Sequence, residues 1–358
     1  MIDRNSFEPL YLQVKNDIIA AIEDGRIKIG DKLMSENEML QYYGVGRMTI
    51  RSALSELVAE GCLKKEQGLG SFCVAYPQRM QRLNIDVLIN SGDIYFIPHV
   101  LKGISRVLEQ NSCNLLLHDT KNSQACIRDL LEDILRKGTD GVLLQPNTLP
   151  EDNAANLQQV LKQYQRAKVP IVAFCGSLLS NDCISLTIDD QYGACIAAQY
   201  LLDCGHRRIL GLFPGFDYCS ALRMEGFEQI MSAHPETAPC VIYRCTDYAS
   251  RMLQAVREGG VTAIQCCNDR LAVECLRLLS EENIRVPDDV SLIGYDNTEL
   301  SLSTIPQLTT IAHPKDHLGS DAAQSLLLLI RAPGSKQGNV VYRPELVIRQ
   351  SVRQLSAK

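Results

Sequence analysis

The sequence predicts two folded regions: an α+β winged helix-turn-helix over residues 1–74, and an α/β region with two parallel-sheet subdomains over residues 83–358. The first observation is the length of 358 residues, because single domains usually have about 100 to 200 residues. The second is a run of three short amphipathic patterns and a hairpin pattern near the N-terminus. The third is the alternation of short apolar runs with longer helical patterns from residue 83 onward, which is typical of parallel sheets covered by helices.

The composition is that of a soluble globular protein, with 46% apolar residues available for a core. No stretch reaches the roughly 18 apolar residues of a membrane-spanning helix, and the N-terminus lacks a basic segment followed by an apolar run. We therefore expect a cytoplasmic protein with no membrane partner. The 14 cysteines are scattered and form no CxxC pair, which favours reduced thiols and predicts no metal site. A cysteine-based redox or metal sensor is the alternative.

The net charge of −6 argues at first against nucleic acid, because DNA binding depends largely on neutralising phosphates. The local balance is different. Residues 1–82 carry 11 basic and 11 acidic side chains, whereas the rest of the chain carries 25 basic and 31 acidic ones. Any DNA contact must therefore come from one face of the N-terminal region.

The first helical pattern begins at Pro9, a residue favoured at the start of helices. Val14, Ile18 and Ile22 recur every four residues, and Gly25 can end the helix. This spacing predicts a short amphipathic helix with one buried face.

A second helix is expected to begin after Ser35, because Ser35 and Glu38 have the spacing of a capping box. It runs to about Tyr43, and Gly44 can adopt the left-handed conformation that ends a helix. The next helix must begin about two residues later, which is the turn length of a helix-turn-helix.

The third helix should bury an apolar stripe formed by Ile50, Leu54, Leu57 and Val58, and Gly61 should close it. Residues 62–74 then predict two short strands joined by a glycine-containing turn at residues 67–70, which is a wing. Residues 75–82 have no apolar period and contain a proline, so they predict a linker.

The region after the linker contains apolar runs that predict strands separated by amphipathic helices. So many strands favour two α/β subdomains with a cleft between them, and ligands are expected where strands end. The predicted strands are residues 84–89 (NIDVLI), 114–118 (NLLLH), 141–145 (GVLLQ), 170–174 (PIVAF), 208–213 (RILGLF), 240–244 (CVIYR), 263–267 (AIQCC) and 290–296 (VSLIGYD).

These stretches resemble two families of bacterial regulators. Residues 9–74 resemble the GntR-type winged helix in SENEMLQYYGVGRMTIRSALSELVAEGCL and EQGLGSFCV. Residues 83–355 resemble the effector domain of LacI/GalR regulators, which is similar to periplasmic binding proteins of type I. The matching stretches are IDDQYGACIAAQYLLDCGHRRI, RMEGF, CNDRLAVECLRLL, VPDDVSLIGYDNTELS and PQLTTIAHPKDHLG.

The fusion of these two families, together with the closing YRPELVIRQSVRQL, resembles the arabinose-responsive repressors. The resemblance implies a homodimer that represses transcription by binding double-stranded operator DNA and leaves the DNA when a sugar binds. It also implies L-arabinose as the sugar, which no residue spacing indicates.

The third helix contains the principal candidates for DNA contact. Arginine is the side chain best able to donate two hydrogen bonds to guanine, so Arg47 and Arg51 are the candidates for reading bases, and Thr49 suits a phosphate. The alternative is that these arginines only lie on a solvent-exposed surface, which is the more common case for exposed arginines taken by themselves. The remaining DNA-binding candidates are Glu36 and Asn37 at the start of the second helix, Gly46 before the third helix, and Gln67 and Gly68 at the wing tip.

Two positions differ from the usual GntR pattern. Met34 stands where proline precedes the capping serine, and Gly46 stands where serine or threonine begins the third helix. Glycine is a tolerated N-cap residue, but it lacks a hydroxyl group that could bind phosphate.

The effector-binding candidates follow strands or occupy positions that the resemblance assigns to the cleft. Asp296 can accept hydrogen bonds from two sugar hydroxyls, although aspartate after a strand is also common in turns. Asn268 offers a donor and an acceptor. The other ligand-binding candidates are Tyr95, Gln145, Asp190, Arg223 and His313.

Two alternatives to a sugar-responsive repressor are open. One is an α/β enzyme fused to a DNA-binding head, which is disfavoured because the sequence contains neither GxxxxGK[ST] nor a nucleophile elbow. The other is the same regulator with another sugar, a sugar phosphate or a purine as effector. We predict no cofactor and no catalysis.

Overall fold

The structure is a computed structural model that describes residues 9–66, 69–74, 82–91, 95–146, 150–176, 178, 183–215, 217–237, 240–243, 245–335 and 337–355. The chain forms two compact units, Met1–Arg82 and Leu83–Lys358. Most of the predicted linker, residues 75–81, lies outside the described residues, as do Gln67 and Gly68.

The first unit contains three helices and a hairpin, as predicted. The helices are α1 (Leu10–Glu23), α2 (Glu36–Tyr43) and α3 (Arg47–Ala59), and the antiparallel strands are β1 (Leu63–Glu66) and β2 (Gly70–Cys73). The capping box forms, since the Ser35 hydroxyl accepts from the backbone N–H of Glu38 and the Glu38 carboxylate accepts from that of Ser35. Gly44 ends α2 with a φ of 63°, in the left-handed region.

The core of this unit joins the three helices to the hairpin. Ile50, Leu54 and Leu57 on α3 are buried, as predicted. The prediction that Val58 belongs to the same buried stripe is wrong, because this residue is 37% exposed. Ala53 occupies the buried face instead. Lys15 on α1 forms ion pairs of 2.8 and 2.6 Å with Glu56 and Glu60 and ties α1 to α3.

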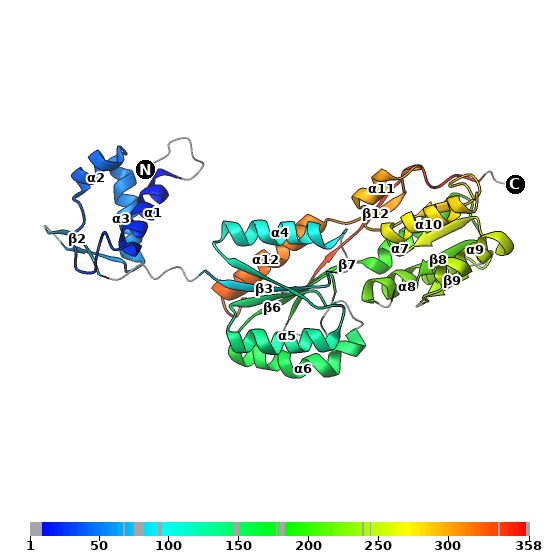
Figure 1. Ribbon diagram of the computed structural model, residues 1–358, viewed down its shortest axis with the longest axis horizontal. Helices are drawn as coiled ribbons and strands as arrows, with labels where there is room; N and C mark the ends of the chain where they lie inside the picture. Colours follow the sequence, from blue (N-terminus) through cyan, green and yellow to red (C-terminus); the bar gives the residue numbers. More distant parts are fainter. Residues whose placement is uncertain are drawn as a thin grey trace. The chain divides into compact units, whose positions relative to one another are not determined.

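The second unit is built on two parallel sheets, as predicted. The larger sheet has six strands in the order β13-β7-β6-β5-β3-β4. Helices α4 and α12 cover one face and α5 and α6 cover the other (Figure 1), and apolar side chains form a core on each face. The strands are β3 (Asn84–Ile89), β4 (Asn114–Asp119), β5 (Gly141–Leu144), β6 (Ile171–Phe174), β7 (Ile184–Ile188) and β13 (Val340–Tyr342), and the helices are α4 (Ile97–Gln110), α5 (Gln124–Lys137), α6 (Pro150–Ala167) and α12 (Lys315–Arg331).

The smaller sheet has four strands in the order β11-β10-β8-β9 and encloses its own apolar core with the surrounding helices. Its strands are β8 (Ile209–Phe213), β9 (Cys240–Tyr243), β10 (Ala263–Cys266) and β11 (Ser291–Ile293), and the helices are α7 (Asp190–Asp203), α8 (Tyr218–Ser232), α9 (Tyr248–Gly259), α10 (Asp269–Glu281) and α11 (Glu299–Ser303).

The chain passes between the two sheets after β7, after β12 and after β13. Strands β12 (Thr310–Ala312) and β14 (Glu345–Val347) pair antiparallel within these crossovers. The apolar patterns of the sequence did not predict β7, β12, β13 and β14. The last three have only three residues each and gain their strand conformation from long-range pairing, which no local pattern reveals.

Glycines allow pairs of helices to approach closely in this unit. A Cβ atom on Gly226 of α8 would lie 2.1 Å from the Gln191 carbonyl oxygen of α7, and one on Gly319 of α12 would lie 2.0 Å from the Val100 carbonyl oxygen of α4. These helices therefore pack backbone against backbone. Within the described residues, no helix is both long and apolar enough to cross a membrane.

Candidate functional site

The exposed face of α3 presents the arginines predicted to contact DNA. The Arg51 side chain is 56% exposed, Arg47 lies in the first turn, and Thr49 is half-buried between them. Gly46 is the N-cap residue with φ −72° and ψ 156°, a conformation open to any residue, and no atom lies within 4 Å of a Cβ placed there. The glycine is therefore not required by the free protein's backbone.

Side chains at the start of α2 hold these arginines. Arg47 Nη2 donates to Asn37 Oδ1 at 3.0 Å, and Arg51 Nε donates to Glu36 Oε2 at 3.0 Å. The other Glu36 oxygen, Oε1, accepts from Lys65 Nζ of β1 at 3.1 Å. The two cations, Lys65 first and then Arg51, lower the pKa of Glu36, so this carboxylate stays ionised.

The Glu36 carboxylate thus links α2, α3 and the hairpin through its two oxygens. The contact between Arg51 and Glu36 uses Nε, so the terminal amino groups of the guanidinium can donate to a base. Glu36 was predicted as a DNA-binding residue, and no sequence pattern indicated its link to Lys65. Gln67 and Gly68, the predicted wing-tip contacts, lie outside the described residues.

In the second unit, Arg223 is the centre of a buried ionic network. Its Nε donates to Asp190 Oδ1 at 2.7 Å, its Nη2 donates to Asp296 Oδ1 at 3.1 Å, and its Nη1 donates to the backbone oxygen of Cys267. All three charged residues are less than a tenth exposed. Burial alone would lower the pKa of Arg223, but the carboxylates of Asp190 and Asp296 raise it well above its usual range.

Asp296 and His313 form a second link of this network, with His313 Nε2 3.2 Å from Asp296 Oδ1. Burial opposes ionisation of Asp296, yet the positive charge of Arg223 and the hydrogen bond from His313 outweigh it and lower the pKa to about 2. Burial lowers the pKa of His313. At neutral pH the network therefore contains an ionised Asp296 beside a neutral imidazole.

The ring of Tyr295 packs against the guanidinium group of Arg223. The Arg223 guanidinium carbon lies 3.6 Å from the centre of the Tyr295 ring, a cation–π contact. A Cβ on Gly193 of α7 would lie 2.1 Å from the Tyr295 hydroxyl oxygen, so only glycine leaves room for this ring. His313 also packs against Phe96, with ring centres 5.3 Å apart.

Arg223 lies on α8, and its partners follow the carboxyl ends of strands. Asp190 follows β7, Cys267 follows β10, Asp296 follows β11 and His313 follows β12. This is the edge of parallel sheets where α/β proteins bind ligands. The structure thus brings together four of the predicted effector residues, Asp190, Arg223, Asp296 and His313.

The other predicted effector residues have different surroundings. Asn268 caps α10, with its side-chain oxygen accepting from the backbone N–H of Leu271 at 2.8 Å. Gln145 is buried after β5, and its Oε1 accepts from the backbone N–H of Asn90 at 3.0 Å. Tyr95 is half-buried just before α4. Both amides therefore use their oxygens within the protein and keep an NH₂ group that can donate.

Two further charged residues of this region were not predicted from the sequence. Asp269 is fully buried and accepts from Thr298 and Thr310, and Lys315 donates from Nζ to the Asn297 carbonyl oxygen at 3.0 Å. Asn268 was a candidate because it is a polar residue after a predicted strand, and the same signal applies to its neighbour Asp269.

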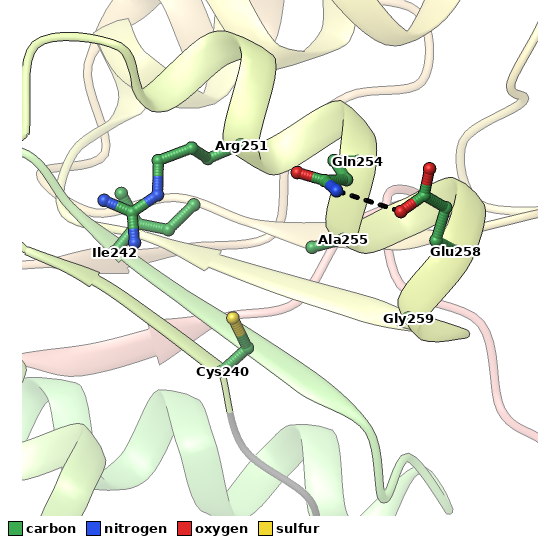
Figure 2. Close-up of a pocket in the computed structure, with 7 residues that line it drawn as sticks. All are labelled: Cys240, Ile242, Arg251, Gln254, Ala255, Glu258 and Gly259. Atoms are coloured by element: carbon green, nitrogen blue, oxygen red, sulfur yellow. Dashed lines mark hydrogen bonds between the residues drawn. The ribbon is translucent and has the colours of Figure 1, made fainter.

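A separate open pocket of about 360 Å³ lies between β9 and α9. Figure 2 shows Arg251 and Cys240 facing it, with Gln254 and Glu258 hydrogen-bonded to each other along the helix. None of its lining residues belongs to the buried network of Arg223. Among the residues that the structure describes, no group of three or more His, Cys, Asp or Glu side chains could hold a metal ion.

Comparison with known proteins agrees with both halves of the chain. Residues 10–73 match the gntR family of bacterial regulatory proteins, and residues 198–352 match the periplasmic binding protein-like domain. The arabinose metabolism transcriptional repressor of Geobacillus stearothermophilus is 31% identical, over 97% of this chain and 98% of the relative. The chain belongs to this family of arabinose metabolism transcriptional repressors. The repressor of the same name from Halalkalibacterium halodurans is 30% identical over 98% of both chains.

The fold of this family member also agrees with solved structures. A LacI-family transcriptional regulator from Enterococcus faecium, crystallised with bound ribose, aligns with a TM-score of 0.65 at 23% identity. The alignment covers 76% of this repressor and all of that chain. The similarity confirms the predicted LacI-type effector fold.

Proposed function

We propose that this repressor controls carbohydrate-utilisation genes by binding a palindromic operator as a homodimer, and that L-arabinose releases it from the DNA. The observation that carries the proposal is the buried network in which Arg223 of α8 joins Asp190 and Asp296, with His313 bonded to Asp296. L-Arabinose is favoured by the names of full-length relatives rather than by the geometry.

The network suits a neutral, polyhydroxylated ligand. Both contacts that Asp296 makes with Arg223 and His313 fall on Oδ1, so Oδ2 can accept from sugar hydroxyl groups. Arg223 and His313 orient that carboxylate, and Tyr95 with Phe96 can pack against the C–H face of a sugar ring. Gln145, Asn268 and Asp190 are proposed as further contacts, the two amides through their NH₂ groups.

An anionic effector is disfavoured by the charges in this region. The positive charge of Arg223 is already matched by the carboxylates of Asp190 and Asp296, and Lys315 lies on a carbonyl oxygen close to Asp296. A phosphate would need cations or helix N-termini that are free to receive it. A sugar phosphate is therefore a weaker candidate than a neutral sugar. A purine is the other alternative effector.

For DNA, we propose that Arg51 and Arg47 read bases in the major groove and that Thr49 contacts a phosphate. Glu36 and Asn37 at the start of α2 orient the two arginines before the DNA arrives. Gly46 at the start of α3 is proposed to lie next to the DNA backbone, where a serine hydroxyl would add a phosphate contact, and Gln67 and Gly68 are proposed to enter the minor groove.

The regulatory step is a linkage between two binding equilibria. If the sugar prefers a conformation of the dimer that spaces the DNA-binding units badly, operator affinity must fall when sugar binds. Operator DNA must then weaken sugar binding by the same factor. This mechanism needs no catalysis, and it acts on chromosomal DNA, so we assign the repressor to the cytoplasm.

The test is operator binding by the full-length protein. An operator is first selected from random-sequence DNA by the protein itself, and its affinity is then measured by fluorescence anisotropy at fixed salt across pentoses and hexoses. L-Arabinose should weaken binding more than the other sugars do. No response to any sugar would eliminate the inducer role, and the largest response to another sugar would eliminate L-arabinose.

A pair of variants connects the response to the network. Asp296→Asn should abolish the sugar response while keeping operator binding. Asp86→Asn is the matched control, because Asp86 is an equally buried acid of β3 that contacts His118 at 2.6 Å. A sugar response that Asp296→Asn retains as fully as Asp86→Asn would exclude Asp296 from the ligand site.

A further inference from the structure

Asp269, the first residue of α10, is a carboxylate in the interior of the effector unit. Its exposed fraction is 0%. Oδ2 accepts from the backbone N–H and the hydroxyl of Thr298 at 2.7 and 3.0 Å, and Oδ1 accepts from the hydroxyl of Thr310 at 2.6 Å. A buried acid with this many donors has a specific structural task.

The donors and acceptors around Asp269 enclose the loop that carries Asp296. The backbone N–H of Asp269 donates to the backbone carbonyl oxygen of Tyr295 at 2.7 Å. The Thr310 hydroxyl, which donates to Asp269, also accepts from the backbone N–H of Asn297 at 3.3 Å. Asp269 is therefore bonded to Tyr295 and Thr298 directly and to Asn297 through Thr310, which leaves Asp296 in the middle of a fixed segment.

The backbone of this segment adopts a conformation that it would not keep unaided. Asp296 has a φ of 94° and Asn297 a φ of 46°, both in the left-handed region that disfavours residues with a side chain. Such residues persist only where the surroundings determine them. A Cβ on Gly294 would lie 2.3 Å from Asp269 Oδ1, so the loop also packs directly against this carboxylate.

We propose that Asp269 is a positioning residue of the effector site, which holds residues 294–298 so that the Asp296 carboxylate faces the sugar. The inference rests on the proposed function, since it assigns a role in sugar binding to a residue that does not touch the sugar. Asp269 acts through Tyr295, Asn297 and Thr298, and its contribution is to fix the direction of the Asp296 side chain.

Asparagine has the shape of aspartate but cannot replace it in this role. The Asp269 oxygens accept from three donors, namely one N–H and two hydroxyl groups. An amide presents one oxygen and one NH₂ group, so its NH₂ group would face at least one of these donors. Asp269→Asn should therefore loosen the loop with little change in packing volume.

The ionisation of Asp269 supports this role. Burial, and next the negative charge of Asp296, raise the pKa of Asp269 to about 6. The charged groups that face it are Asp296 on the loop and Lys315 on α12, while His313 and Arg223 act on it through Asp296. Protonation near pH 6 removes the carboxylate that holds the loop, and sugar affinity should weaken with it.

The first experiment measures amide hydrogen exchange in the full-length protein without sugar. In Asp269→Asn, exchange of the amides at residues 297 and 298 should become at least about tenfold faster, because their acceptors are weakened. Asp86→Asn is the control for loss of a buried negative charge, and it should leave these amides unchanged. Unchanged exchange in Asp269→Asn would overturn the proposal whatever the sugar does.

The second experiment measures L-arabinose affinity by calorimetry from pH 5 to 8. Asp269→Asn should weaken binding at pH 8 by about 10- to 100-fold, the size expected for a lost hydrogen bond to a charged group, and should retain operator binding. The wild type should lose affinity as the pH falls through about 6, and the variant should lose less, because it lacks the Asp269 carboxyl group that takes up the proton.

The outcomes separate the two ideas. If the wild type binds no sugar, the proposed function fails, while the exchange experiment still decides whether Asp269 holds the loop. If the wild type binds L-arabinose and Asp269→Asn binds it equally well, the positioning role is wrong. If Asp269→Asn and Asp86→Asn lose affinity alike, with the same pH profile, Asp269 is merely structural and the proposal also fails.

Discussion

Replacing Arg51 by alanine tests the assignment of α3 as the helix that reads DNA. The Arg51 side chain is 56% exposed and makes its contact with Glu36 through Nε alone, at 3.0 Å. An exposed ion pair of this kind contributes at most about 1 kcal/mol to folding. The opposite face of α3, with Ile50, Leu54 and Leu57, remains buried, so the DNA-binding unit should fold normally.

The effect on DNA should be larger than the effect on stability. A bidentate arginine–guanine contact contributes about 1 to 3 kcal/mol of discrimination, so the operator dissociation constant should rise by about 5- to 150-fold. Binding to random DNA should change far less, because a base contact adds little to non-specific affinity. The assay is fluorescence anisotropy with operator and random duplexes at several salt concentrations.

Arg26→Ala provides the matched control. Arg26 lies in the same unit, its side chain is 58% exposed, and it pairs with Asp24 at 2.8 Å, so the two substitutions remove equal charge from similar surroundings. The control should leave operator discrimination unchanged. Equal losses on operator and random DNA in Arg51→Ala would mean that Arg51 touches only phosphate, and a similar loss of discrimination in Arg26→Ala would refute the reading role of α3.

Three further predictions follow from single positions. Gly46→Ser should raise the unfolding free energy of the DNA-binding unit by a few tenths of a kcal/mol, because the N-cap position has room for a side chain. It should also tighten operator binding in the same anisotropy assay. Weaker binding would mean that DNA needs the glycine. The pKa of Asp296 is about 2 instead of its ordinary 3.8, because Arg223 and His313 outweigh burial. The net stabilisation by the ionised carboxylate is therefore complete above about pH 4 and is lost as the pH falls through about 2, a change of about 2.5 kcal/mol. Urea unfolding from pH 5 to 2 should show this loss in the wild type and a flatter profile in Asp296→Asn, and parallel profiles would contradict it. Gly193→Ala should lower the unfolding free energy by about 1 to 3 kcal/mol in thermal denaturation, because its Cβ would meet the Tyr295 hydroxyl, and a second substitution Tyr295→Phe should recover part of the loss.

Local signals in the sequence were sufficient for the DNA-binding unit. The capping box at Ser35, the left-handed Gly44 and the apolar stripe of α3 depend on residues close together in the chain, and each predicted an observed feature. The exception is Val58, which lies at the edge of the stripe. Whether such a residue is buried depends on how far the neighbouring helices extend over it, and periodicity does not record that distance.

The effector unit shows the limit of the same reasoning. Apolar runs located the long strands, but β12, β13 and β14 are too short for a pattern and form only where distant segments pair. For the site, the sequence and its resemblance indicated Asp296, Arg223 and His313 individually. It did not indicate that they share one buried network with Asp190, nor that Asp269 is bonded to the segment that carries Asp296.

The sequence by itself determined the order of domains, the positions of most helices and strands, and the residue types available for DNA and for a polar effector. These follow from helix and strand periodicity and from capping residues, which act within a few positions along the chain. Only the tertiary structure decided the partners: that Glu36 joins Arg51 to Lys65, and that the charge of Arg223 is shared between two carboxylates. The physical reason is that burial, charge compensation and pKa depend on groups brought together from distant segments, and their distances exist only in the folded chain.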